Sequence, residues 1–229
     1  MDSITANPTM VEQAYRAILD AICDGTLAPG ERLTQEGVAK KLDVSRQPVN
    51  QALMLLKQQK FVCEAGRRGL MVAPLDRDYM RWIYELRLGI EPIAAALAAR
   101  HAGAATVDEG RALLAAGQAA VREGAIGPLI GADMAFHMWI YATSRNRLFV
   151  DTMEGLWHHL RRAMREVLLQ RDYRKAVWTE HERILRAIIA RDEGAASALV
   201  RAHLTSAAIS VAVAVPAAAP SASAGTKTG

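Results

Sequence analysis

The chain has 229 residues, of which 51% are hydrophobic and 23% are charged, and its formal net charge is +4. This length accommodates two domains of ordinary size, and an aromatic content of only 5% argues against a β-sandwich or barrel. We expect no membrane helix and no secretory signal, because the chain has no unbroken apolar run of membrane length and no basic start followed by an apolar segment. Two cysteines, Cys23 and Cys63, cannot form a disulfide framework, so a reducing cytoplasm is the expected location.

The first 75 residues predict three helices followed by a hairpin. The first helix begins at the capping-box pair Thr9 and Glu12 and ends at Gly25. The second is short, at about 35–42, and is capped by Thr34. The third begins after Ser45. Two β-like pieces, 61–64 and 70–73, flank the segment Gly66-Arg67-Arg68-Gly69, which predicts a hairpin tip that carries two arginines.

The same segment holds a local excess of positive charge. Between Lys40 and Arg68 there are seven lysines and arginines, opposed only by Asp43 and Glu64. The third helix has an apolar side and a polar side, and the polar side consists of Arg46, Gln47, Asn50, Gln51 and Met54. This order of elements predicts a winged helix-turn-helix, in which the third helix reads the major groove of DNA and the wing contacts the backbone. The alternative is a winged helix that binds protein.

Several motifs in this region occur together in one order. They are Leu27-x-Pro29-Gly30-x-x-Leu33, Val44-Ser45-Arg46-x-Pro48-Val49, Ala52-Leu53 and the glycine-containing wing. Over nearly all of residues 10–75 the chain resembles the N-terminal domain of GntR-type bacterial transcription regulators. The resemblance implies that Arg46 reads a base or a phosphate and that position 50 reads a base.

The chain departs from this family where Gln47 and Asn50 stand, since the family commonly has Thr and Arg there. Asn pairs well with adenine and Arg with guanine, so the usual operator preference is not expected. We predict that Arg46 and Asn50 carry specificity and that Lys41 and the two wing arginines mainly carry affinity. The predicted DNA-binding set is Lys41, Arg46, Gln47, Asn50, Arg67, Arg68 and Gly69.

Residues 76–214 predict an all-α bundle. Its helices are expected at 76–102, 106–123, 126–143, 146–170, 172–191 and 193–213. The segment 215–229 consists mainly of Ala, Pro, Ser, Gly and Thr, and we expect it to be a disordered tail. The predicted fold is therefore mainly α, with a winged helix-turn-helix at 1–75, a helical domain at 76–214 and a tail.

One acidic residue and three histidines in the helical part have the chemistry of a metal site. Asp133 and His137 are four residues apart, so they project from the same face of one helix, while His181 and His203 lie on later helices. An antiparallel bundle can bring all four together, and one carboxylate with three imidazoles suits Zn²⁺, Ni²⁺ or Mn²⁺. From the residues alone, a polar helix pair and two buried core histidines explain the same pattern.

Residues 76–208 also resemble a known domain. The residues that carry this resemblance are Leu86 to Glu91, Asp133 to His137, Asn146, Glu180-His181, Asp192 to Ala196 and His203. They resemble the FCD effector-binding domain, which implies that Asp133, His137, His181 and His203 hold a divalent metal, and six helices fit the shorter VanR-type branch. Arg87 is a candidate clamp for a ligand carboxylate, and the alternative is an ion pair with Glu91.

These observations predict a ligand-responsive transcription regulator that is not an enzyme. We expect a repressor that binds a palindromic double-stranded operator as a homodimer and responds to a small carboxylate bound near the metal. Two alternatives are a metal-dependent hydrolase that carries a winged helix and an interaction protein that has lost DNA binding. The sequence offers no His-Glu-x-x-His, Gly-x-Ser-x-Gly or phosphate-loop motif in favour of the hydrolase.

Overall fold

A computed structural model describes residues 8–66, 69–168 and 171–215. It divides into two compact units. The N-terminal unit contains the chain up to Pro74 together with Glu154–Arg165, and the helical unit contains Leu75–Met153 and the residues that follow Arg165.

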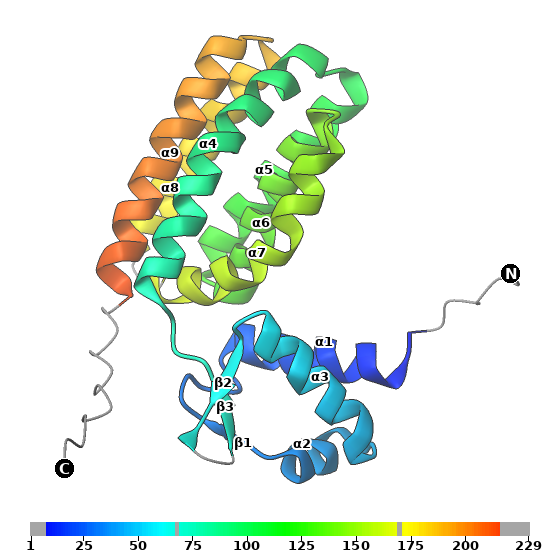
Figure 1. Cartoon of the computed structure of the whole chain (residues 1–229). Coiled ribbons are helices and arrows are strands. Elements are labelled where there is room, and N and C mark those ends of the chain that lie inside the picture. The colour runs from blue at the N-terminus through cyan, green and yellow to red at the C-terminus, as the bar shows by residue number, and fades with distance from the viewer. Residues whose placement is uncertain (1–7, 67–68, 169–170, 216–229) are drawn as a thin grey trace, which may run out of the picture. The chain divides into compact units, whose positions relative to one another are not determined.

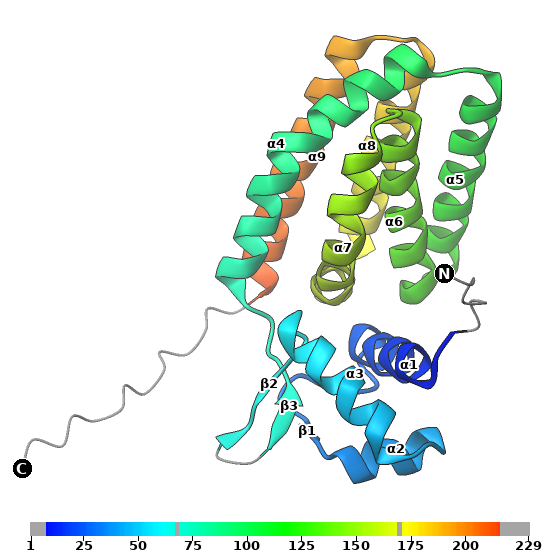
Figure 2. The same cartoon turned by 45° about the vertical axis from the view of Figure 1, so that its right-hand side comes forward.

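The N-terminal unit contains the three predicted helices and the predicted hairpin in the expected order, with one further strand between the first two helices. These elements are α1 (Met10–Asp24), β1 (Arg32–Leu33), α2 (Gln35–Leu42), α3 (Arg46–Gln58), β2 (Val62–Glu64) and β3 (Leu70–Val72) (Figures 1 and 2). The predicted capping box opens α1, because Glu12 N donates to Thr9 Oγ1 at 3.2 Å and Thr9 N donates to Glu12 Oε2 at 2.8 Å. Gly25 ends α1 with a φ of 80°, a left-handed conformation that favours glycine.

The three strands form one small antiparallel sheet in the order β1-β3-β2, with Cys63 opposite Met71. The hairpin of β2 and β3 is as predicted, whereas β1 was not foreseen, because two residues carry no alternation. Ser45 is the N-cap of α3 as expected, but its side chain makes no capping hydrogen bond. The amide groups at the start of α3 therefore have no side-chain cap from Ser45.

The apolar side of α3 lies at the centre of the N-terminal core. Val49, Ala52, Leu53 and Leu56 are all fully buried, and α3 packs against α1. This burial fixes the opposite, polar side of α3 at the surface. Orientation of that polar side is thus a consequence of the apolar periodicity at 49, 52, 53 and 56.

Part of α7 (Arg147–Val167) completes the N-terminal unit. The His159 ring stacks on Phe61 with 4.0 Å between the ring centroids, and the Arg162 guanidinium donates to the carbonyl of Ala73. Cys23 Sγ donates to the carbonyl of His158 at 3.4 Å. Phe61 is only 1% exposed, and the His159 ring of α7 covers one face of its ring.

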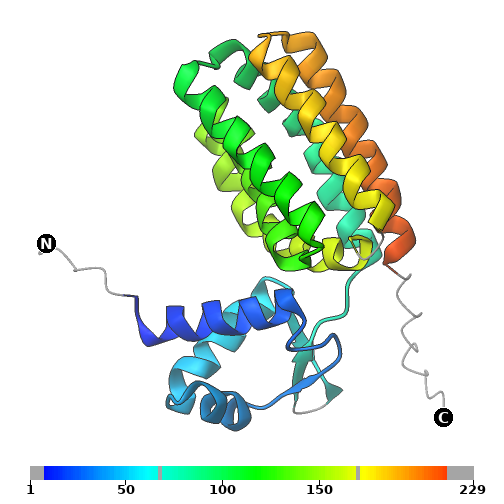
Figure 3. The ribbon, with the colours of Figure 1, turned by 180° about the vertical axis from the view of Figure 1, so that it is seen from behind.

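The helical unit consists of helices that match the predicted positions to within a few residues. They are α4 (Arg77–His101), α5 (Ala104–Glu123), α6 (Ile126–Thr143), the two ends of α7, α8 (Arg171–Ile189) and α9 (Glu193–Ala214). In all views α4 and α9 run side by side, and α8 lies next to α9 (Figures 1 and 3). Val215 is the C-cap of α9 and is 1% exposed, which removes it from the predicted tail, and residues 216–229 lie outside the described part.

The last helix is long and apolar enough to cross a membrane by length and composition alone. It packs against α4 and α8 and places His203 and Leu204 inside the unit. A core helix of a soluble protein passes the same test. We therefore treat α9 as an element of the bundle.

Two glycines of α5 give close packing against tryptophans of neighbouring helices. A Cβ atom at Gly117 would lie 1.8 Å from Cη2 of Trp178, and one at Gly110 would lie 2.5 Å from Cζ2 of Trp139. Trp139 and Trp178 are 4% and 3% exposed. The indole rings thus occupy the space that the missing side chains leave, which brings α5 close to α6 and α8.

Candidate functional site

The polar side of α3 borders a hollow in the N-terminal unit, which we call the recognition hollow. It has a volume of about 620 Å³ and is open to solvent. Its lining residues are Arg32, Leu33, Thr34, Gln35, Glu36, Arg46, Asn50, Met54, Glu64, Gly66, Gly69 and Leu70. The start of α2, the start of α3 and the base of the hairpin meet here, which is the place where a winged helix presents side chains to DNA.

The predicted DNA-binding residues are distributed unevenly around this hollow. Arg46, Asn50 and Gly69 line it, and Gln47 and Lys41 are exposed on α3 and α2. Arg67 and Arg68 lie outside the described residues. The recognition hollow also contains Arg32 and Gln35, which are not in the predicted DNA-binding set.

Gln35 makes a specific contact with a predicted base-reading residue. Its Nε2 donates to Oδ1 of Asn50 at 2.7 Å. Gln35 is the first residue of α2, where Thr34 Oγ1 accepts from Gly37 N at 3.0 Å and so fixes the start of the helix. The two exposed side chains, 15 positions apart in sequence, therefore form one hydrogen-bonded pair.

In the helical unit, three histidines from three helices meet in the interior. His137 comes from α6, His181 from α8 and His203 from α9, and one ligand atom from each lies within 4.8 Å of the other two. Their exposed fractions are 0%, 0% and 5%. We call this group the histidine cluster. Asp133, the fourth predicted ligand, is also buried, and its Oδ1 lies 3.5 Å from Nε2 of His181.

Two carboxylates orient two of these rings. Glu91 Oε2 accepts from His137 Nδ1 at 2.9 Å, and Glu180 Oε2 accepts from His203 Nδ1 at 2.7 Å. A proton held on Nδ1 leaves Nε2 as the atom that can bind a metal. This carboxylate–histidine arrangement is the one that usually surrounds metal-binding imidazoles.

The third ring, that of His181, has no such support. Neither of its nitrogens has a hydrogen-bond partner among the described residues, although the ring is completely buried. Burial lowers the pKa of His181 well below its ordinary value, and His203 and His137 lower it further. Burial also lowers the pKa of His137, against the opposing effect of Glu91. Neutral imidazoles bind metal directly, and a buried, unsatisfied ring is costly unless something binds it.

The donor set therefore fits a divalent transition metal. Three buried imidazoles suit Zn²⁺, Ni²⁺ or Mn²⁺, and Asp133 Oδ1, 3.5 Å from Nε2 of His181, is the candidate fourth donor.

Arg87, the predicted effector clamp, forms a buried ion pair. Its Nε donates to Glu91 Oε1, its Nη2 lies 3.5 Å from Glu91 Oε2, and its guanidinium carbon is 5.1 Å from the centre of the Tyr84 ring. Burial opposes both charges, but the mutual attraction raises the pKa of Arg87 and lowers that of Glu91. The alternative that the sequence left open, a pair with Glu91, is therefore present. Since Glu91 also accepts from His137, a single carboxylate connects Arg87 to the histidine cluster.

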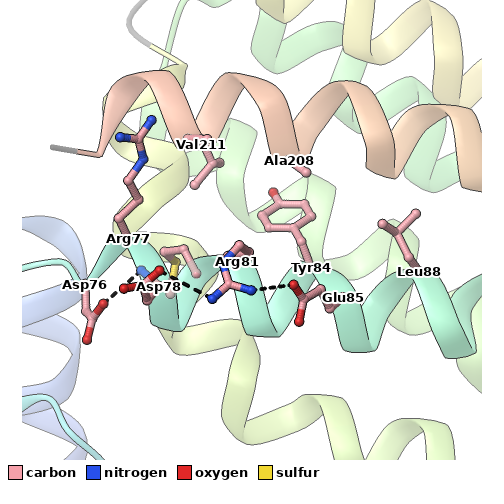
Figure 4. A pocket seen from close by; sticks show the side chains of 11 residues that line it. Asp76, Arg77, Asp78, Arg81, Tyr84, Glu85, Leu88, Ala208 and Val211 are labelled. Carbon is pink, nitrogen blue, oxygen red and sulfur yellow. Dashed lines mark hydrogen bonds and ion pairs between the residues drawn. The ribbon is translucent and has the colours of Figure 1, made fainter. Parts of the chain in front are cut away.

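A second hollow lies on the surface between α4 and α9, and its volume is about 640 Å³ (Figure 4). Its floor is apolar, with Tyr84, Leu88, Ala208 and Val211, and its rim carries Asp76, Arg77, Asp78, Arg81 and Glu85. Arg81 donates to Glu85 Oε1 at 2.7 Å and lies 3.4 Å from Asp78 Oδ1. None of the four predicted metal ligands lines this hollow.

The site residues themselves follow from the sequence better than their hydrogen-bond partners do. Glu180 was seen only as the neighbour of His181, and Glu91 only as a partner for Arg87. Adjacent residues on a helix project in different directions, so Glu180 does not face the ring of its neighbour His181. No local spacing therefore reveals that Glu180 accepts a hydrogen bond from His203. Gln35 had no local signal at all.

Comparison with known proteins assigns the chain to a family. Residues 82–206 match the family described as "FCD domain", and residues 10–72 match "Bacterial regulatory proteins, gntR family". The chain is a GntR-family protein with an FCD domain. It is a DNA-binding transcriptional regulator of this type and not an enzyme. This assignment does not favour the hydrolase alternative.

Relatives of this GntR-family regulator cover most of its length. It is 26% identical over 193 residues to the HTH-type transcriptional regulator YdhC of Bacillus subtilis, covering 83% of this chain and 86% of the relative. It is 27% identical over 176 residues to the Nta operon transcriptional regulator of Aminobacter aminovorans, covering 77% and 82%. The solved structure of Escherichia coli McbR/YncC has the same fold, with a TM-score of 0.77 at 20% identity over 90% of this chain and 98% of that one. The VanR-type branch stays a prediction.

Proposed function

We propose that this regulator is a cytoplasmic repressor whose hold on its operator is controlled by a small organic acid bound near a divalent metal in the helical unit. The observation that carries the proposal is the histidine cluster, since three helices each contribute a buried imidazole to one point. A ligand bound there touches α6, α8 and α9 together. Such a ligand favours one arrangement of the helices, which is the physical requirement for control of a distant site.

On the DNA side, we assign base reading to Arg46 and Asn50. Both line the recognition hollow, and both lie on the exposed side of α3. Gln47 and Gly69 are assigned to the same interface, and Lys41, Arg67 and Arg68 to phosphate contacts. Loss of a base contact costs about 1–3 kcal/mol at one operator position, whereas loss of a phosphate contact weakens all sequences alike.

We assign the operator two symmetric half-sites and the regulator a homodimer. One winged helix contacts one half-site, and a two-fold dimer matches a palindrome. Exposed apolar side chains of α4 and α9 suit such an interface. They are Trp82, Leu86, Ile93, Ile209 and Val213. Exposed apolar residues at helical spacing on two adjacent helices are typical of a protein interface.

At the effector site, we assign Asp133, His137, His181 and His203 as metal ligands. A bound divalent cation supplies a positive charge that a single ligand carboxylate does not neutralise, and this favours an anionic effector. Arg87 is the candidate second contact for that effector. Because Glu91 already holds Arg87, a carboxylate effector must share or replace that partner.

The test uses the full chain, purified without chelator and offered Zn²⁺, Ni²⁺ or Mn²⁺. We expect about one bound ion per chain, loss of that ion in His181→Ala, and a 5–150-fold change in operator affinity on addition of the correct small carboxylate. The operator is obtained by selection from a random duplex pool, and its binding by Arg46→Ala is measured at equal salt. A chain that retains none of the three metals refutes the metal site, and unchanged operator binding by Arg46→Ala refutes the DNA assignment.

The oligomeric state is tested separately by sedimentation at micromolar concentration, with and without operator DNA. We expect a dimer, and we expect Trp82→Glu to shift it toward monomer while Gln58→Glu, which adds the same charge on the surface of the other unit, does not. A monomeric wild type under both conditions refutes the homodimer.

A further inference from the structure

The pair formed by Gln35 and Asn50 is positioned to control which base Asn50 reads. Both side chains line the recognition hollow, next to Arg46, and both are exposed. Gln35 Nε2 donates to Asn50 Oδ1 at 2.7 Å, so the carbonyl oxygen of the Asn50 amide is turned toward α2. The Asn50 NH₂ group is on the opposite branch of the same planar amide and therefore faces away from Gln35.

This orientation matters because the two branches of an amide have opposite hydrogen-bonding character. Asparagine reads adenine through both branches, with its oxygen accepting from N6 and its nitrogen donating to N7. With the oxygen engaged by Gln35, the branch left for the groove is the donor. A donor suits a base edge that consists of acceptors, and guanine presents two acceptors, N7 and O6, in the major groove.

We propose that Gln35 is a positioning residue for specificity, which holds Asn50 as a hydrogen-bond donor and directs it to guanine in place of adenine. The proposal rests on the assigned role of α3 in base reading and names the base that one position of the operator carries. Gln35 is suited to this role because it is the first residue of α2, and its backbone is fixed by the Thr34 cap. The predicted preference for guanine differs from the preference for adenine that is expected from Asn50 alone.

The proposal predicts how the preferred base changes with the side chain at position 35. Glutamine donates to Asn50 and selects guanine. Glutamate can only accept, so the Asn50 amide turns over, donates to the glutamate and presents its oxygen to the DNA. That oxygen suits cytosine or adenine, whose N4 and N6 amino groups are donors. Alanine releases the amide, which then reads adenine through both branches.

The experiment is selection of bound sequences from a random duplex pool by the full chain, followed by affinities for operators that differ at one base pair. Asn50→Ala first identifies the base pair that Asn50 reads, as the position where preference is lost. At that base pair we expect wild type to favour guanine over cytosine by about tenfold or more, Gln35→Glu to reverse this ratio and Gln35→Ala to favour adenine. Gln58→Glu adds the same charge at the exposed far end of α3 and is expected to keep the wild-type preference.

The outcomes separate this inference from the assignment on which it rests. If wild type selects no sequence, or Asn50→Ala changes no preference, the base-reading role of Asn50 is refuted. If Asn50→Ala loses one preference but wild type, Gln35→Glu and Gln35→Ala all select the same base there, the role of Gln35 is refuted. A purely structural role for Gln35 would lower the affinity for every sequence equally, which also counts against the proposal.

Discussion

Removal of the Glu180 carboxylate tests whether the histidine cluster is built as a metal site. Glu180 Oε2 lies 2.7 Å from His203 Nδ1, so it fixes the ring and leaves Nε2 directed to the metal position. Loss of such a partner typically weakens metal binding 10–100-fold, which is about 1.4–2.7 kcal/mol. The Glu180 side chain is 33% exposed, and water can replace part of its effect. We therefore expect Glu180→Ala to weaken zinc binding by about tenfold, at the lower end of that range.

The chain offers a closely matched control on the same helix. The Glu182 side chain is 35% exposed and accepts from Arg186 at 2.5 Å, so Glu182→Ala also removes one partly exposed carboxylate from α8. That pair lies on the surface and does not include a histidine of the cluster, and its loss is expected to cost less than about 1 kcal/mol of stability. Glu91 is a poorer choice, because its removal also leaves the buried Arg87 without its carboxylate.

The assay is competition for zinc against a coloured chelator, with thermal unfolding measured in the presence of EDTA. We expect both variants to unfold near the wild-type temperature without metal, and only Glu180→Ala to lose zinc affinity. Glu180→Gln is expected to fall between them, since an amide oxygen still accepts but carries no charge. Equal zinc affinity in Glu180→Ala and Glu182→Ala would refute the view that Glu180 orients a metal ligand.

Two further predictions concern stability. Replacing glycine by alanine within a helix normally stabilises a protein by about 1 kcal/mol. Gly117→Ala should instead destabilise the chain by about 1–3 kcal/mol, because the new Cβ would lie 1.8 Å from Trp178. Gly131→Ala, in α6 with open space around it, is the control, and a denaturant titration that finds Gly117→Ala as stable as Gly131→Ala contradicts this packing. Burial, with a smaller contribution from Arg162, lowers the pKa of His159 to about 4, so the folded chain binds fewer protons here than the unfolded chain. The free energy of unfolding should therefore fall by about 3 kcal/mol as the pH drops from about 6.5 to 4. His159→Phe should reduce this loss. An identical pH dependence in the variant would show that His159 does not titrate in this way.

The sequence predicted those parts of the fold that depend on local spacing. The capping box of Thr9 and Glu12, the left-handed end at Gly25 and the six helical segments after residue 75 all follow from short-range patterns, and the structure contains them. The strand β1 was missed because its formation depends on β3, about 40 residues later, and not on its own two residues.

In the candidate site, too, features that depend on local spacing were predicted and features that depend on distant parts of the chain were not. Asp133 and His137 were found from their spacing on one helix, but which carboxylate serves which imidazole is decided by packing between helices. Glu180 and His203 are 23 positions apart, and Glu91 and His137 are 46 apart. Pairs at such separations follow from the registers of α4, α6, α8 and α9, which depend on how side chains interlock and not on composition.

The part of α7 that completes the N-terminal unit limits how freely the DNA-binding domain of this regulator can be joined to the helical domain of another. A fragment that ends at residue 75 retains every strand and helix of the winged helix-turn-helix, yet it loses the His159 ring that covers Phe61 and the Arg162 donor to Ala73. Both partners lie within the segment 82–206 that belongs by sequence to the FCD domain. A chimera joined at the end of β3 would therefore bring together surfaces that were not selected to fit. Exchange of DNA-binding modules between such regulators is expected to succeed only when residues 154–165 are exchanged with them or matched to their new neighbours.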